Sequence, residues 1–157
     1  RVRRFRFFDD LRALMQEEIQ SGAYDAIIHS AAVSDYRVAA VYTENEKMIA
    51  HSEEQNKIGS NHPSLTIKLV PTEKLIDLIR EPWGFSGTLV KFKLQVGLTD
   101  EELLKIAERS LRVSAANLIV ANCLEWAHEY AYVLDAKGGC ERVTRFDLPN
   151  ALLRRFK

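Results

Sequence analysis

The stretch AIIHSAAVSDYR, residues 26–37, decides the fold that we predict for this chain. Ala26, Ile27 and Ile28 form a short apolar run after Asp25, which is typical of a strand covered on both faces of a parallel sheet. The run then changes abruptly to small and polar residues. Ligands of open α/β sheets bind outside the carboxyl ends of such strands, so this change indicates a candidate binding edge.

Three residues at that edge suit a bound nucleotide. Ala31 and Ala32 carry almost no side chain, so a ligand can approach the backbone closely. Asp35 follows, where its carboxylate could hold a hydrated magnesium ion beside phosphates. The alternative is an ordinary turn, with Ser34 and Asp35 as turn-forming residues. Spacing alone leaves both interpretations open.

Composition and charge exclude several classes of protein. The 157 residues suffice for one domain with a substantial core, and 22 Lys and Arg balance 22 Asp and Glu, so no net field favours nucleic acid or a membrane surface. No apolar run approaches the roughly 20 residues that span a bilayer, and the opening RVRRFRFF lacks the apolar core of a signal peptide. Cys123 and Cys140 are too few for a zinc site or a disulfide framework, which makes a reducing cytoplasm the expected location.

Apolar periodicity predicts alternating strands and helices along the rest of the chain. The expected strands cover residues 4–7, 26–28, 65–69, 88–94, 118–121, 130–135 and 140–145, and the expected helices are capped or begun by residues 9–10, 71–72, 99 and 147. Strand–helix–strand units of this kind imply a parallel sheet. The turn at 136–139 joins the last two strands as a hairpin, and Thr99 with Glu102 forms a capping box.

The segment 38–64 has a different character. It is rich in glutamate and other polar residues and has no clean period, so we expect a mobile loop or flap. Lys57 lies within it. Its residue type and position alone would make it one surface lysine among many.

AAVSDYR at 31–37 resembles the signature of the phosphopantothenoylcysteine synthetases, which join phosphopantothenate to cysteine in coenzyme A biosynthesis. Four later stretches fall in the order that this family would require: NKIGS at 56–60, LVPTEKLIDLI at 69–79, LVKFKLQVG at 89–97 and NLIVANCLE at 117–125. The resemblance implies one synthetase-like domain over residues 1–157, a three-layer Rossmann-like or ribokinase-like α/β fold with a mainly parallel sheet and a C-terminal β-hairpin. It also implies that the family's first strand, glycine-containing loop and catalytic asparagine lie N-terminal to Arg1.

The resemblance further implies a ligand role for six residues. The nucleotide, ATP or CTP, would contact Ala31, Ala32, Asp35, Lys57 and Phe92. Asp35 would also hold Mg²⁺, and Lys57 would act catalytically on the phosphates. Asn122 would bind the substrate. A homodimer is implied as well. For Phe92, pattern alone favours a plain core phenylalanine.

The chain departs from the family pattern at several positions. The second lysine of the family's flap motif is Gly59 here, and the usual glutamate is Gln95. In the bacterial members of the family that the chain resembles, lysines are expected at the positions of Ser110 and Ser114, and an aspartate at the position of Asn117. These departures leave the choice between ATP and CTP open.

The implied chemistry is a two-step ligation through an acyl-nucleotidylate. Such a site needs positioning and charge neutralisation more than a strong nucleophile. The competing interpretation is a non-catalytic, Rossmann-like nucleotide-binding module. A nicotinamide-dependent oxidoreductase is disfavoured, since no G-x-G-x-x-G sequence occurs, and the four histidines show no metal-binding spacing.

Overall fold

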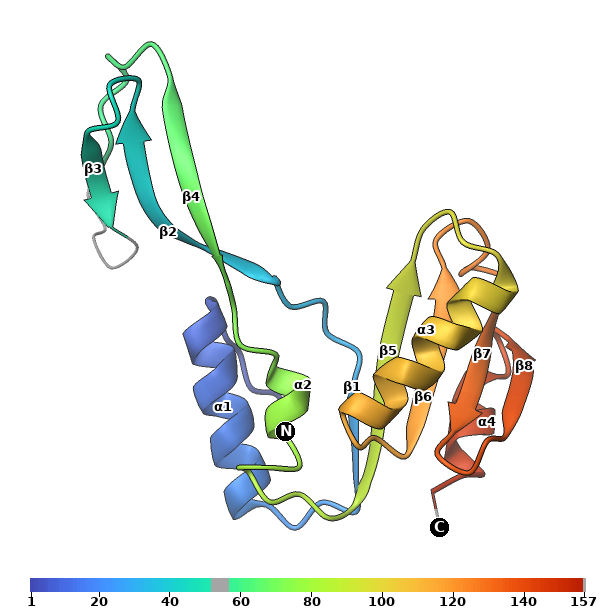
Figure 1. Ribbon diagram of the computed structural model, residues 1–157. Coiled ribbons are helices and arrows are strands. Elements are labelled where there is room, and N and C mark those ends of the chain that lie inside the picture. Colours follow the sequence, from blue (N-terminus) through green and yellow to red (C-terminus); the bar gives the residue numbers. More distant parts are fainter. Residues whose placement is uncertain (52–56, 157) are drawn as a thin grey trace. The chain divides into compact units, whose positions relative to one another are not determined.

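The computed structural model describes residues 1–51 and 57–156, which form two compact units (Figure 1). The main unit combines Arg1–Ala31 with Leu75–Lys157, and the inserted unit is Ala32–Lys74. The inserted unit therefore contains the segment 38–64 that its composition set apart. None of the described helices is long and apolar enough to cross a membrane.

A five-stranded sheet forms the centre of the main unit. Its strands, in spatial order, are β1 (Ala26–His29), β5 (Thr88–Gln95), β6 (Leu118–Cys123), β7 (Tyr130–Asp135) and β8 (Cys140–Thr144). The first three run parallel, and β7 and β8 continue the sheet as an antiparallel hairpin. The predicted α/β class and the C-terminal hairpin are confirmed.

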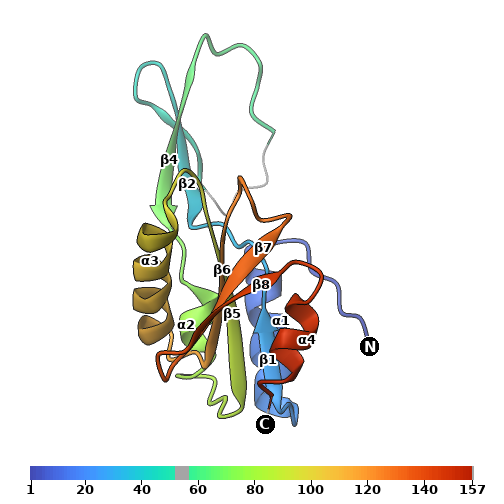
Figure 2. The same ribbon diagram turned by 90° about the vertical axis from the view of Figure 1, so that its right-hand side faces the viewer.

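Helices cover both faces of this sheet, which makes three layers (Figure 2). The four helices of the main unit are α1 (Phe8–Ser21), α2 (Leu75–Leu78), α3 (Asp100–Val113) and α4 (Leu148–Leu153). Leu118 and Val120 of β6 point to the face that α4 covers, where they join one buried cluster. Ile119 lies between them in sequence and points to the other face, over which α3 packs. All six residues of β6 are buried, as the apolar run predicted.

The capping box of α3 is confirmed, whereas the start of α1 differs from expectation. Oγ1 of Thr99 accepts the amide of Glu102, and the Glu102 carboxylate accepts the amide of Thr99 at 2.9 Å. Helix α1 begins at Phe8 rather than after an Asp9 or Asp10 cap, because the Asp10 carboxylate accepts the amide of Phe7 at 3.0 Å from inside the first turn.

The strand predicted over residues 4–7 is wrong. Residues 1–6 have no regular structure, and Phe5 and Phe7 remain 52% and 61% exposed instead of facing a core. Arg3 pairs with Glu17 and Glu18 on α1, so the segment lies along the helix. Alternation of side chains produces a strand only where another strand supplies hydrogen bonds.

The inserted unit is a three-stranded antiparallel sheet in the order β3-β2-β4. Its strands are β2 (Tyr36–Thr43), β3 (Met48–His51) and β4 (Leu65–Pro71). The predicted strand at 65–69 is confirmed, and within the segment 38–64, where we expected a loop or flap, residues 38–43 and 48–51 belong to the strands β2 and β3. Register shifts between Val38 and Ala40, and between Val41 and Tyr42, interrupt the alternation by which β2 would have been recognised. The mobility of the segment stays a prediction.

The two ends of the inserted unit are tied to each other. The amide of Thr72 donates to the carbonyl of Asp35 at 2.9 Å, and the Thr72 hydroxyl donates to the carbonyl of Ser34. The predicted helix from 71–72 to 79 is shorter than expected, because regular helix covers only Leu75–Leu78.

Candidate functional site

Phe92 and Asn122 lie on one face of the sheet, towards the carboxyl ends of β5 and β6. Phe92 is the register partner of Val120, and Leu94 is the partner of Asn122, so side chains of these two rows point to the same side. Phe92 is half-buried and packs against the core cluster beneath α4. The core interpretation of Phe92 therefore holds for part of its surface, and the remainder is open.

Asn122 is a buried polar residue whose side-chain amide can form further hydrogen bonds. It is 8% exposed, and within the described part of the chain its side-chain amide has no hydrogen-bond partner. Its amide atoms are not themselves cut off from solvent, because they are not among the fully buried side-chain atoms that lack a partner in the described residues. The amide can therefore be reached from the carboxyl edge of β6, where it offers a donor and an acceptor to a ligand.

His29 and Lys91 form a cross-strand pair that sequence reasoning did not single out. They are direct partners in the β1–β5 ladder. Lys91 is only 8% exposed, and its Nζ donates to Oγ of Ser114 at 3.0 Å and to the carbonyl of Ser110 at 3.2 Å. Burial, and then the charge of Lys91, lowers the pKa of His29. One signal was present in the sequence, the alternation of residues in β5, which places the side chains of Lys91 and Phe92 on opposite faces of the sheet. That alternation does not reveal which residues cover Lys91.

Ser110, Ser114 and Asn117 therefore serve the internal structure of the main unit. Ser114 accepts from Lys91 and donates to the carbonyl of Ser110 at 3.0 Å. Oδ1 of Asn117 accepts hydrogen bonds from Arg80 and from the amide of Leu89. These three positions, where the resemblance implies departures from the family pattern, are thus occupied by residues with intramolecular partners.

Ala31 and Ala32 follow β1 and are exposed, with the first in the main unit and the second in the inserted unit. Small exposed residues directly after a parallel strand fit the expected close approach of a ligand to the backbone. The hydroxyl of Ser34 has a partner within the chain, since it donates to the carbonyl of Tyr36 at 2.6 Å.

Asp35 and Lys57 are exposed residues of the inserted unit. The backbone of Asp35 is fixed by Thr72, whereas its carboxylate makes no hydrogen bond or ion pair with the residues that the structure describes. Lys57 lies outside regular structure, and among the described residues the two charges do not form an ion pair with each other. Both are accessible to an external ligand.

The donor set limits the kind of metal site that Asp35 can form. Within residues 1–51 and 57–156 no group of three histidine, cysteine, aspartate or glutamate side chains could hold a metal ion. Magnesium is commonly held by one or two carboxylates, waters and substrate phosphates rather than by a complete protein cage. A single exposed carboxylate fits that kind of site.

The chain is similar to proteins of coenzyme A metabolism. The family model for the DNA/pantothenate metabolism flavoprotein C-terminal domain matches residues 8–133. The coenzyme A biosynthesis bifunctional protein CoaBC of Thermococcus kodakarensis is 34% identical over 119 residues, which are 74% of this chain and 26% of that protein. Phosphopantothenate–cysteine ligase 2 of Oryza sativa subsp. japonica is 36% identical over 94 residues, which are 59% of this chain and 25% of that protein.

A solved structure shares the fold over nearly the whole chain. The DNA/pantothenate metabolism flavoprotein from Streptococcus pneumoniae superposes with a TM-score of 0.79 at 30% identity, covering 98% of this chain and 70% of that one. The chain spans about a quarter of the length of the curated relatives it matches.

Proposed function

Because the chain belongs to the DNA/pantothenate metabolism flavoprotein C-terminal domain family, we propose that the protein acts as a phosphopantothenate–cysteine ligase in coenzyme A biosynthesis. The names of its relatives from Thermococcus kodakarensis and Oryza sativa support this activity. The structural observation that carries it is the side-chain amide of Asn122, which has no partner among the described residues, beside the open part of Phe92 at the carboxyl edge of a parallel sheet.

The proposed reaction has two steps. The carboxylate of phosphopantothenate attacks the α-phosphate of ATP or CTP, forming an acyl-nucleotidylate as pyrophosphate leaves. The amine of cysteine then attacks the acyl carbon, forming the amide as the nucleoside monophosphate leaves and the amine gives up a proton. Both steps depend mainly on orienting the reactants and stabilising phosphate charge.

We assign the main-unit residues to recognition. The aromatic ring of Phe92 offers an apolar surface to the nucleotide base, and the amide of Asn122 offers both a donor and an acceptor to substrate. Ala31 lets the ligand approach the backbone that follows β1. Burial, and then the charge of Lys91, lowers the pKa of His29 at the end of β1, which favours the neutral imidazole.

We assign the inserted-unit residues to the phosphates. Ala32 continues the small-residue segment, Asp35 would hold the magnesium ion, and the ammonium of Lys57 would stabilise negative charge on the phosphates during attack. When bound, magnesium neutralises phosphate charge and so favours departure of pyrophosphate.

Two further features belong to the same proposal. We propose a homodimer, on the resemblance to the synthetase family, and a cytoplasmic location, which suits a chain whose Cys123 and Cys140 are both free thiols.

Pyrophosphate release tests the proposed function. The intact protein would be incubated with magnesium and ATP or CTP, with and without phosphopantothenate, and then with cysteine. We expect release that depends on phosphopantothenate and an amide product that depends on cysteine. Nucleotide binding without any release, for both nucleotides, would instead support the non-catalytic binding module.

A further inference from the structure

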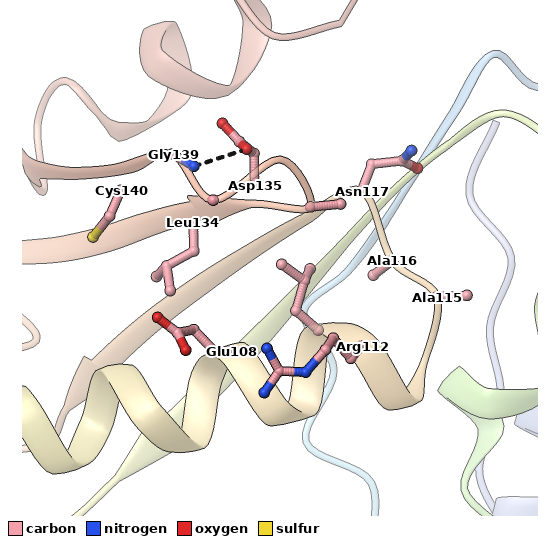
Figure 3. Close-up of a pocket in the computed structure, with 12 residues that line it drawn as sticks. Glu108, Arg112, Ala115, Ala116, Asn117, Leu134, Asp135, Gly139 and Cys140 are labelled. Atoms are coloured by element: carbon pink, nitrogen blue, oxygen red, sulfur yellow. Dashed lines mark hydrogen bonds between the residues drawn. The ribbon is translucent and has the colours of Figure 1, made fainter.

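A pocket lies beside the start of β6, at the opposite end of that strand from Asn122. Figure 3 shows the residues that line it. The pocket has a volume of about 430 Å³, within the range of small-molecule sites. One wall is the last part of α3 and the residues that follow it, and the other is the turn between β7 and β8. Its lining includes Glu108, Leu111, Arg112, Ala116, Leu134 and Cys140.

The base of this pocket is apolar and its rim is charged. Leu111, Ala116 and Leu134 are each at most 5% exposed and form the base. Glu108 and Arg112 are exposed and stand one helical turn apart, on the side of α3 that faces the turn (Figure 3). A ligand lying on the base would therefore meet a carboxylate and a guanidinium together.

The two charged side chains are available to a ligand. Oppositely charged residues four positions apart on a helix often pair, but Glu108 and Arg112 form no ion pair with each other or with any other described residue. Asp135 also lines the pocket, yet its Oδ1 already accepts the amides of Lys137 and Gly139 at 2.8 and 3.0 Å. Asp135 therefore shapes the turn, while Glu108 and Arg112 remain for recognition.

The walls are held in place by hydrogen bonds from several elements. The amide of Ala116 donates to the carbonyl of Leu111, and Nε of Arg80 donates to the carbonyl of Ala115 at 3.0 Å. The amide of Ala136 donates across to the carbonyl of Asn117 at 3.1 Å, which links the two walls. Small-molecule sites are usually formed before the ligand arrives, and this pocket meets that condition.

We propose that this pocket binds a small zwitterion of the amino-acid type with an aliphatic side chain. The ligand carboxylate would accept paired hydrogen bonds from Arg112, the ligand ammonium would donate to Glu108, and the aliphatic part would cover Leu111, Ala116 and Leu134. The site is separate from the edge that carries Phe92 and Asn122, so this inference does not depend on the proposed ligase activity.

Cys140 provides a direct readout, because its exposed thiol lines the pocket. The rate of alkylation of Cys140 by a maleimide would be measured on the intact protein with increasing L-leucine. We expect saturable protection with a dissociation constant on the order of 1 mM. N-acetyl-L-leucine lacks the ammonium and L-leucinamide lacks the carboxylate, so each should protect at least about tenfold more weakly. The buried Cys123 should not react, which reports that the protein stays folded.

Three variants complete the test. Glu108→Gln and Arg112→Gln should each weaken protection by L-leucine about tenfold or more, whereas Arg109→Gln, on the same helix but outside the lining, should leave it unchanged. Each variant is compared with its own ligand-free rate, since burial, and then the charge of Glu108, raises the pKa of Cys140. Absence of protection by L-leucine, or equal protection by the two blocked forms, would overturn the proposal.

Discussion

The guanidinium of Arg80 and the side-chain amide of Asn117 join the amino ends of two neighbouring parallel strands. Nη2 of Arg80 donates to Oδ1 of Asn117 at 2.6 Å, and the same oxygen accepts the amide of Leu89 at 2.7 Å. Arg80 also donates to the carbonyls of Phe85 and Gly87, each at 2.8 Å. Leu89 lies in β5 and Asn117 directly precedes β6, so these bonds fix the loop between α2 and β5 against the start of β6.

We expect Asn117→Ala to lower the free energy of unfolding by about 1–3 kcal/mol, because the fully buried Leu89 would lose the acceptor for its amide. Asn117→Asp should retain wild-type stability, since a carboxylate accepts the same two bonds and pairs with the Arg80 charge. Urea denaturation of both variants measures this. An Asn117→Ala protein with an unchanged midpoint would show that the bonds do not stabilise the fold.

Asp35→Asn should cause a large loss in the rate of pyrophosphate release, because the proposed magnesium site would lose a full negative charge. Excess magnesium should partly restore the rate. Glu44→Gln, at another exposed carboxylate of the inserted unit, serves as the control and should behave as wild type. Wild-type turnover in Asp35→Asn would remove Asp35 from the metal site.

Lys57→Ala should lower kcat on the order of 10²-fold or more, since an ammonium that stabilises developing phosphate charge acts chiefly in the transition state. Stability should change by no more than about 0.5 kcal/mol, because Lys57 is exposed. Lys47→Ala removes another exposed lysine of the inserted unit. Equal kinetic constants in the two variants would contradict a role for Lys57 in catalysis.

Tyr132→Phe should cost about 1–2 kcal/mol at neutral pH, because the hydroxyl of Tyr132 donates to the Asp100 carboxylate at 2.6 Å. The hydrogen bond to Asp100, followed by burial, raises the pKa of Tyr132 to about 12. The stabilisation is therefore present below the unfolded pKa of about 10 and is lost as the pH rises towards 12.

Denaturation of wild type and Tyr132→Phe at pH 7 and near pH 11 would test this dependence. The stability difference should shrink at the higher pH. Tyr130→Phe is the matched control, because the Tyr130 hydroxyl has no hydrogen bond to the described residues while its ring stacks on Trp126. A difference that stays constant with pH would mean that the hydrogen bond to Asp100 is not its source.

Lys91→Gln should raise the pKa of His29, because it removes a neighbouring positive charge and leaves burial as the remaining cause of the depression. Since that pKa lies below its unfolded value, wild type loses stability as the pH falls below about 6.5, and the variant should lose less. NMR titration of the His29 ring would measure the shift. Lys93→Gln, two residues along β5, should leave the pKa of His29 nearly unchanged.

The sheet of the main unit could be predicted because its signals are local. Thr88–Gln95 and Leu118–Cys123 differ from the expected strands only at their ends, and the capping box at Thr99 fixed the start of α3. Apolar runs, caps and glycine turns act over a few residues, so a sequence displays them directly. The prediction at residues 4–7 is wrong because a strand needs a partner strand, which is not a local feature. Alternation within residues 4–7 could not show whether such a partner exists.

The site could be predicted less completely. The motif after β1 drew attention to Asp35, but nothing near Asp35 or Lys57 in sequence defines their ligands. The pairing of His29 with Lys91 depends on the register between β1 and β5, whose residues are separated by the whole inserted unit. Likewise, whether the amide of Asn122 has a partner depends on residues outside β6 and could not be deduced from that strand's sequence alone.

The hydrogen bonds between Thr72 and the Ser34–Asp35 segment bear on how the chain tolerates insertions. They hold the entry and the exit of the inserted unit together, so these two ends stay adjacent whatever the turns between its strands contain. Lengthening a turn between β2, β3 and β4 would then leave the register of β1 with β5 undisturbed. We therefore expect insertions in these turns to be tolerated without loss of the main-unit sheet.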